Sequence, residues 1–296
     1  MDELFSRFPL PADFATIDSQ LNEIRNASSA YETDTQALST MFHCIDLTSL
    51  NTSDSAESIR AFVNKVNTFA TDYPDLQNVG GICVYPVFAP VLSSVLKVPG
   101  VHKAVVAACF PSSQTFTDIK CAEVRKAVDF GADEIDIVIS VGEFLEGNYE
   151  FVGREIAQIK EAAAPARLKV ILETGTLATT ENIWYASIVA MLAGADMIKT
   201  STGKNGIGAT PEAAFVMCRA IKEYVRQENR RVGFKPAGGV STVADACYYY
   251  NIVRTVLGTD WLVPELFRIG TSRLSNLLLN AQLKLRNPNA VEIKYF

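Results

Sequence analysis

The chain has 296 residues, 48% of them hydrophobic, a formal net charge of -6 and a pI near 5.1. This acidic balance disfavours nucleic acid or an anionic membrane surface as the main partner, because both require a basic face. No apolar run approaches the ~20 residues of a membrane span, and residues 1–7 lack the charged and apolar regions of a secretory signal. We therefore expect a cytoplasmic protein with no membrane or nucleic-acid partner.

Cysteine and histidine usage points the same way. The six cysteines show no CxxC or other metal-binding spacing, and several lie in apolar stretches, which is typical of reduced thiols in a cytosolic protein. The two histidines, His43 and His102, are far apart in the sequence and lie near apolar strands. This disfavours a zinc site built from histidines, and we expect neither a metal nor another cofactor.

Polar residues dominate the first 40 positions, where short helices are predicted over 18–25 and 31–41, so we expect an N-terminal helical extension over 1–40. A barrel domain over 41–286 and a C-terminal tail over 287–296 complete the predicted organisation. Short apolar stretches predict eight strands, over 42–46, 81–85, 103–109, 134–139, 168–173, 197–200, 232–235 and 266–270. Helical periodicity separates them, most clearly over 117–130 and 212–227.

Strict alternation of strand and helix predicts parallel strands joined by crossover helices, and eight such units are the number that closes a (β/α)8 TIM barrel. A doubly wound open sheet is the alternative, but no strand is followed by a GxGxxG turn. Polar residues gather where the predicted strands end, which is the face on which barrel enzymes build their sites.

Lys199 ends the strand predicted over 197–200, and strand alternation places it on a face where an apolar residue would be expected. Burying an ammonium costs several kcal/mol, so Lys199 needs either a carboxylate partner or a way to lose its proton. Lys235 ends the next predicted strand in a similar context. Two neighbouring ammonium groups disfavour each other's charge, and a neutral amine attacks carbonyls. Alternatively, both lysines hold their charged ends in solvent.

Asp136 lies at the centre of the strand predicted over 134–139 and should point into the barrel. A buried carboxylate there needs a cation, which Lys199 or Lys235 could supply. Asp136 is then either a structural ion-pair partner or a proton shuttle. Glu134 shares its parity but begins the strand, so we expect it at the far end of the barrel.

Glycine breaks follow the last three predicted strands, and such turns let backbone N–H groups approach an anion closely. Loops after barrel strands 7 and 8 are the usual phosphate cradle. The breaks predict a phosphorylated substrate bound by Thr202, Gly203, Lys204, Gly238, Gly239, Gly270, Thr271 and Ser272.

Six motifs, in order, resemble those of deoxyribose-phosphate aldolase, a class I aldolase built on a (β/α)8 barrel. They are ICVYP from 82, GADEID from 131, LKVILETG from 168, IKTSTGK from 198, VGFKPAGG from 232 and FRIG from 267. The resemblance implies that Lys199 forms a Schiff base, that Asp136 and Lys235 transfer protons, and that Asp46, Cys83 and Lys169 surround the cavity. It also implies cleavage of 2-deoxy-D-ribose 5-phosphate to acetaldehyde and D-glyceraldehyde 3-phosphate. The long N-terminal part is more similar to the eukaryotic branch.

Two positions depart from that pattern. Arg273 stands where the family usually has a small polar residue, and Tyr295 precedes the last residue, whereas some members end on a tyrosine that reaches the site. Tyr295 is a candidate for the same role. Two rival functions remain, namely a Schiff-base aldolase for a different sugar phosphate and a non-catalytic phosphate-binding barrel; either could form a homo-oligomer.

Overall fold

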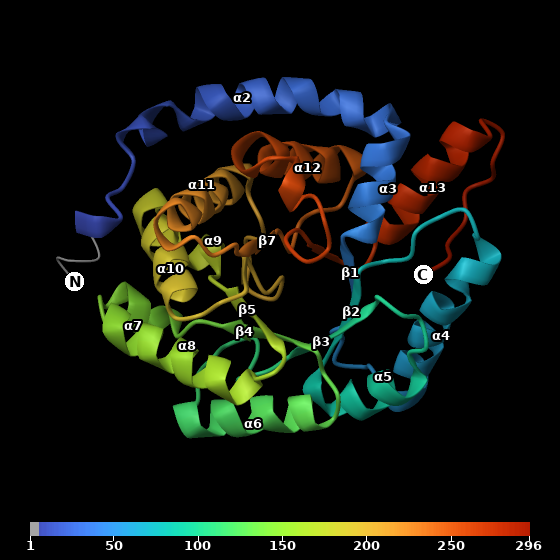
Figure 1. The fold of residues 1–296 in the computed structure, drawn as a ribbon. Helices are drawn as coiled ribbons and strands as arrows, with labels where there is room; N and C mark the ends of the chain where they lie inside the picture. Colours follow the sequence, from blue (N-terminus) through green and yellow to red (C-terminus); the bar gives the residue numbers. More distant parts are fainter. Residues whose placement is uncertain (1–5) are drawn as a thin grey trace.

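The computed structural model describes residues 6–296, so the expectation that residues 1–7 carry no secretory signal lies mostly outside it. The chain begins with η1 (Ala12–Thr16), α2 (Ile17–Ser28), η2 (Ser29–Thr33) and α3 (Thr35–His43). Helix α2 runs along the outer side of α11 (Pro211–Glu228) and α12 (Val243–Leu257) (Figure 1). It buries its apolar side chains Leu21 and Ile24 there.

Within residues 6–296, eight parallel strands form one sheet in the order β7-β6-β5-β4-β3-β2-β1-β8. Isolated parallel bridges join Phe234 to Phe267 and Ala237 to Gly270, so β7 also meets the segment that carries β8. The prediction of a (β/α)8 barrel is confirmed, and the open-sheet alternative is wrong. The strands are β1 (Ile45–Thr48), β2 (Gly81–Val84), β3 (His102–Val106), β4 (Glu134–Val138), β5 (Arg167–Ile171), β6 (Met197–Lys199), β7 (Gly233–Lys235) and β8 (Ile269–Thr271).

Helices surround the strands (Figure 1). The main hydrophobic core takes buried side chains from both the strands and the helices. Several helices begin at a Ser or Thr whose hydroxyl accepts a backbone N–H, as at Thr210 and Thr242. Over residues 6–296, no helix is both long and apolar enough to cross a membrane. The outer elements are α4 (Ala56–Asp72), η3 (Pro86–Phe88), α5 (Ala89–Val95), α6 (Thr117–Asp129), α7 (Val141–Leu145), α8 (Tyr149–Ala163), α9 (Thr174–Leu177), α10 (Thr180–Leu192), α11, α12, η4 (Thr259–Trp261) and α13 (Leu274–Arg286).

Two local predictions are wrong. The first strand begins at Ile45, because the two residues predicted to open it, 42 and 43, form the last turn of α3. On α6 the periodicity predicted over 117–130 would bury apolar Ile119 and expose charged Lys120, but Ile119 is 52% exposed and Lys120 is 1% exposed. Lys120 is buried because its ammonium donates to Glu155 of α8 at 2.8 Å. The ion pair compensates the buried charge of Lys120, which helical periodicity alone would place on the outer surface.

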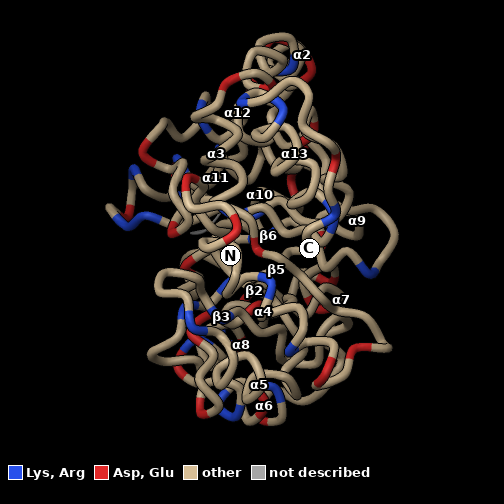
Figure 2. Tube along the Cα trace, turned by 90° about the vertical axis from the view of Figure 1, so that its right-hand side faces the viewer, with Lys and Arg blue, Asp and Glu red and all other residues tan. Residues whose placement is uncertain are grey.

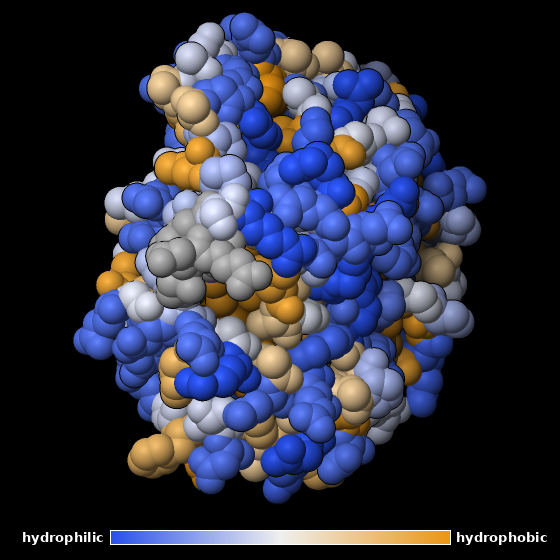
Figure 3. Space-filling view, turned by 60° about the vertical axis from the view of Figure 1, so that its left-hand side comes forward, coloured by the Kyte–Doolittle hydropathy of each residue, from blue (hydrophilic) through white to orange (hydrophobic). Residues whose placement is uncertain are grey.

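Charged residues of both signs are interspersed along the outer elements rather than segregated (Figure 2). The face that Figure 3 brings forward is mainly hydrophilic, with small apolar patches between the polar side chains. The dense concentration of charge lies inside the barrel.

Candidate active site

Among the described residues, seven charged side chains meet inside the barrel, and none is more than 4% exposed. Strand parity explains their meeting, because Asp136 is the register partner of Lys169, and Lys199 is the register partner of Lys235. The set consists of Asp46 on β1, Glu134 and Asp136 on β4, Lys169 on β5, Lys199 on β6, Lys235 on β7 and Arg268 immediately before β8.

Asp136 bridges the two lysines that end β6 and β7. Lys199 Nζ donates to Asp136 Oδ2 at 2.9 Å, and Lys235 Nζ donates to the same oxygen at 2.8 Å. Lys235 also donates to Oδ2 of Asp46. The structure thus brings together Lys199, Asp136 and Lys235, and both lysines have a carboxylate partner.

The two lysines differ in how firmly they hold their protons. Burial lowers the pKa of Lys199; the Asp136 carboxylate opposes this effect and the Lys235 ammonium adds to it, leaving the pKa below its usual value. For Lys235 burial acts in the same direction, but two carboxylates, Asp136 and Asp46, raise its pKa above the usual value. Lys199 is therefore the lysine that can become a neutral amine, while Lys235 stays an ammonium.

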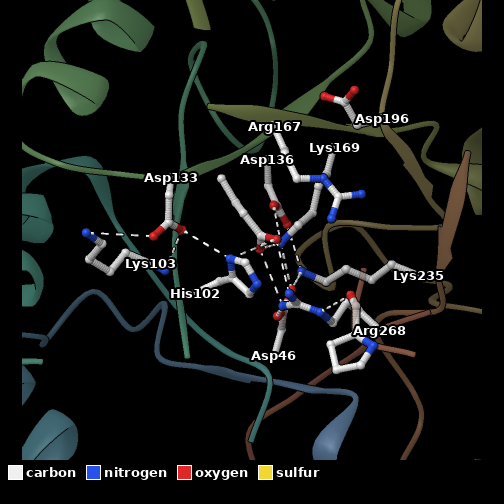
Figure 4. Close-up of polar contacts among 12 residues, drawn as sticks. Asp46, His102, Lys103, Asp133, Asp136, Arg167, Lys169, Asp196, Lys235 and Arg268 are labelled. Carbon is white, nitrogen blue, oxygen red and sulfur yellow. Dashed lines mark hydrogen bonds and ion pairs between the residues drawn. The ribbon is translucent and has the colours of Figure 1, made fainter. Parts of the chain in front are cut away.

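A second, lower layer of charge is formed by Asp46, Glu134, Lys169 and Arg268. Figure 4 shows Asp46, Lys169 and Arg268 gathered around Asp136 and Lys235. Lys169 Nζ lies 2.9 Å from Asp46 Oδ2, 2.5 Å from Glu134 Oε2 and 3.3 Å from Asp136 Oδ1. Arg268 pairs with Asp46 and, at 3.1 Å, with Glu134. Glu134 begins β4, as expected, and lies in this lower layer, where it shares Lys169 with Asp136.

Sequence reasoning missed Arg268. It lies in the FRIG motif, two positions before Gly270 in the strand predicted over 266–270. That parity was the signal that could have placed its side chain inside the barrel, although it does not identify Asp46 as the partner.

Cys83 lies in a small apolar cluster near Asp136 and Lys235. It packs with Leu50, Ala104 and Val106, and Tyr85 and Phe110 cover this cluster. Burial raises the pKa of the Cys83 thiol to about 11. The thiol therefore stays protonated near neutral pH and serves as a small apolar surface beside the charged groups.

The glycine turns after β6 and β7 lie against each other. Gly203 and Gly238 both have positive φ, and a Cβ on Gly238 would come within 3.2 Å of Gly203 Cα. Gly239 also has positive φ but is exposed, with its nearest neighbouring atom 3.9 Å from the Cβ position. Lys204 Nζ donates to the Leu50 carbonyl at 2.5 Å and so crosses the barrel mouth.

A buried carboxylate, Glu173, fixes the turn after β6. It accepts hydrogen bonds from the Thr202 hydroxyl at 2.6 Å, the Thr202 backbone N–H at 3.2 Å and the Asn205 amide at 3.2 Å. Sequence reasoning quoted Glu173 within a motif but gave it no role. Its position at the end of β5 was the available signal.

The turn after β8 adjoins the turn after β7 through the Ala237–Gly270 bridge. Gly270 leaves room for Lys235, because a Cβ there would lie 3.1 Å from Lys235 Cε. Thr271 accepts the backbone N–H of Leu274, the first residue of α13, while Ser272 and Arg273 are exposed on the rim. The three predicted glycine turns thus occupy neighbouring positions around the mouth.

Tyr295 packs on the outside of the barrel, away from these charged side chains, so its assignment as a site candidate is wrong. Its hydroxyl donates to Asp72 Oδ2 at 2.5 Å and lies 3.1 Å from the Lys65 carbonyl oxygen, both on the outer helix α4. The ring packs edge-on against Phe69 of the same helix. Backbone hydrogen bonds to the Asn276 side chain of α13 hold the tail there.

Comparisons with known proteins agree with this architecture. The chain is 40% identical to the deoxyribose-phosphate aldolase of Homo sapiens over 78% of this chain and 76% of the human protein. The deoxyribose-phosphate aldolase of Bos taurus is 39% identical over the same shares.

Solved structures give the same result. The aldolase QR15 is 28% identical and superposes with a TM-score of 0.66 over 82% of this chain and 96% of that one. The deoxyribose phosphate aldolase of Aeropyrum pernix, described as having a unique tetrameric structure, shares the fold with a TM-score of 0.65 at 24% identity over 90% of this chain and 98% of its own. The DeoC/LacD family aldolase model matches residues 40–252. The chain therefore belongs to the DeoC/LacD family of aldolases.

Proposed function

We propose that this protein is a class I aldolase that reversibly cleaves 2-deoxy-D-ribose 5-phosphate to acetaldehyde and D-glyceraldehyde 3-phosphate through a Schiff base on Lys199. The observation that carries the proposal is the buried Lys199 amine, whose pKa is lowered while it shares Asp136 with a charged Lys235. The similarity to animal deoxyribose-phosphate aldolases supports the choice of substrate.

In this reaction, neutral Lys199 attacks the C1 aldehyde and water leaves, which gives a protonated imine. A base removes the C3 hydroxyl proton, the C2–C3 bond breaks, and its electron pair moves into the imine to form an enamine. D-glyceraldehyde 3-phosphate departs, C2 takes up a proton, and hydrolysis of the imine releases acetaldehyde and the free lysine. Asp136 and Lys235 lie beside Lys199 and are the groups we assign to these proton transfers.

The phosphate would bind in the cradle formed by the turns after β6, β7 and β8. The glycines would let an anion approach the backbone of these turns closely, and Lys204 is exposed at the rim, where it supplies positive charge. Asp46 accepts hydrogen bonds from Lys169 and Lys235, which supports a role for this group in holding the charged pair in position. The proposed chemistry requires no metal or cofactor. We place the protein in the cytoplasm, where its six free cysteines would stay reduced.

The test offers the enzyme 2-deoxy-D-ribose 5-phosphate and a panel of other sugar phosphates, and measures release of acetaldehyde. In parallel, the protein is incubated with acetaldehyde and borohydride and its mass is measured. We expect cleavage of the deoxyribose phosphate and one added ethyl group per chain. Trapping with preferred cleavage of another sugar phosphate would indicate a different class I aldolase. Absence of both would indicate a non-catalytic barrel.

Substituting Gly239 tests the phosphate cradle. Gly239→Leu places a bulky side chain at the exposed turn, so KM for the phosphorylated sugar should rise at least about tenfold, while KM for 2-deoxy-D-ribose changes little. Only the phosphorylated sugar uses binding energy at this turn.

Gly147→Leu is the matched control, because Gly147 and Gly239 both have φ +83 and Gly147 has no atom within 4 Å of its Cβ position. It should leave both KM values unchanged. Equal loss on both substrates in Gly239→Leu would show that the turn is only structural.

A further inference from the structure

The charges inside the barrel do not balance when every group is ionised. Among the described residues, the cluster contains four cations, on Lys169, Lys199, Lys235 and Arg268, and three carboxylates, on Asp46, Glu134 and Asp136. The excess is one positive charge (4 − 3 = 1). An uncompensated buried charge costs several kcal/mol, so the cluster favours loss of one proton.

The contacts show which of the four cations loses its proton. Lys169 lies within ion-pair distance of three carboxylates, while Lys235 and Arg268 each contact two. Lys199 pairs with Asp136 alone, and it shares that oxygen with Lys235. A guanidinium does not deprotonate in proteins, so Arg268 stays charged. Lys199 is the cation that the cluster stabilises least.

We propose that Arg268 and Glu134 are positioning residues that set the charge of Lys199 from the layer beneath it. Arg268 engages Asp46 Oδ1 and Glu134 Oε1, while Asp46 Oδ2 is shared by Lys169 and Lys235. Each carboxylate is therefore engaged by other cations, and Lys199 has only its share of Asp136. This inference rests on the proposed function, in which Lys199 must react as a neutral amine.

The backbone around Arg268 is shaped for this role. A Cβ on Gly81 would come within 2.7 Å of Arg268 Nη1 and 2.6 Å of Asp46 Oδ1, so only glycine leaves room for the pair. Arg268 Nε donates to the Pro264 carbonyl at 2.5 Å, which fixes the plane of the guanidinium. The Arg268 side chain is therefore fixed against Asp46 and Glu134 (Figure 4).

Other titratable groups also face the cluster. His102 Nδ1 lies 3.8 Å from Glu134 Oε1 and 3.7 Å from Asp133 Oδ1, and Lys103 pairs with Asp133 at 3.7 Å (Figure 4). Burial raises the pKa of the Cys44 thiol to about 12 and that of the Cys83 thiol to about 11, so both stay neutral near neutral pH. The variants below leave all five of these residues unchanged.

The experiment measures the pKa of Lys199 by labelling the folded protein with acetic anhydride across a pH series and mapping the labelled peptides. This readout requires no turnover, so it remains informative even if the proposed reaction fails. Arg268→Met removes the excess cation (3 − 3 = 0), so the labelling profile should move up by about half to one pH unit. Glu134→Gln enlarges the excess (4 − 2 = 2), so the profile should move down by a similar amount.

The double variant restores the original excess (3 − 2 = 1) and should return the profile to near its starting pH. Arg231→Met is the matched control, because Arg231 is 57% exposed and pairs only loosely with Asp260, at 3.7 Å. Its profile should not move. General structural damage would move both single variants in the same direction. That result, or no shift in the near-isosteric Glu134→Gln, would overturn the inference. Failure of acetaldehyde trapping with the opposite shifts intact would instead reject only the proposed function.

Discussion

Replacing Lys199 with alanine should abolish borohydride trapping of acetaldehyde and reduce cleavage of 2-deoxy-D-ribose 5-phosphate by at least about 10⁴-fold. Such a loss corresponds to about 5.4 kcal/mol of transition-state stabilisation, because each factor of ten is about 1.36 kcal/mol. It follows from removing the only group to which we assign the covalent bond to substrate. Peptide mapping of the wild-type adduct should locate the added mass on Lys199.

Lys199→Arg separates the role of the amine from that of the charge. Arginine retains a cation opposite Asp136 but stays protonated and forms no imine, so this variant should be as inactive as alanine. Lys160→Ala is the control, because Lys160 is also paired with a carboxylate, Asp196 at 2.6 Å, but lies on the outer helix α8. It should trap acetaldehyde normally. An adduct on Lys235 in the wild-type protein would reverse the roles of the two lysines.

The sequence predicted the barrel and the group formed by Asp136, Lys199 and Lys235, because both depend on local patterns. Strand alternation places Asp136 inside β4, and a lysine ends both β6 and β7, so the closed sheet must bring the three side chains together. The glycine turns could be found for the same reason. Each turn adopts a backbone conformation that favours glycine, so the requirement for glycine can be recognised from the turn alone.

The lower layer, formed by Asp46, Glu134, Lys169 and Arg268, could not be predicted in this way. Its ion pairs join residues that are distant in the chain. Arg268 reaches Asp46 only because β8 pairs with β1, which no local pattern states. The burial of Lys120 likewise depends on Glu155 from a neighbouring helix. The position of Tyr295 is set by Asn276, a side chain on the surface of α13.

The lower layer also makes Lys199 and Lys235 differ in how readily each loses its proton. Repulsion between Lys199 and Lys235 alone would make either lysine a candidate for losing its proton. Asp46 removes that symmetry, because it forms an ion pair with Lys235, whereas Lys199 pairs with Asp136 among the residues that the structure describes. The difference between the two lysines therefore originates on β1, outside the motifs in which the lysines lie.

Replacing Asp136 with asparagine should lower kcat by about 10²- to 10⁴-fold, the range typical of general acid-base catalysis, while imine formation persists. Three cations, Lys169, Lys199 and Lys235, outweigh the effect of burial and hold the pKa of Asp136 well below its usual value, so the native group is a carboxylate near neutral pH. Asparagine keeps the size but cannot accept a proton. It also removes the group that raises the pKa of Lys199, so more of that lysine becomes a neutral amine.

Stability must be measured alongside these rates, because a carboxylate whose pKa is depressed in the folded state contributes stability above its unfolded pKa. That contribution is lost as the pH falls toward the folded pKa. We therefore expect Asp136→Asn to be less stable than the wild type near neutral pH, with the difference shrinking in acid.

Asp133→Asn is the control, because Asp133 precedes the same strand and is 42% exposed, and it should change neither kcat nor trapping. If Asp136→Asn instead unfolds the protein while its soluble fraction keeps full activity, Asp136 is a structural ion-pair partner. Slow turnover with retained trapping would support the proton-transfer role, because a purely structural carboxylate has no reason to affect bond cleavage after the imine has formed.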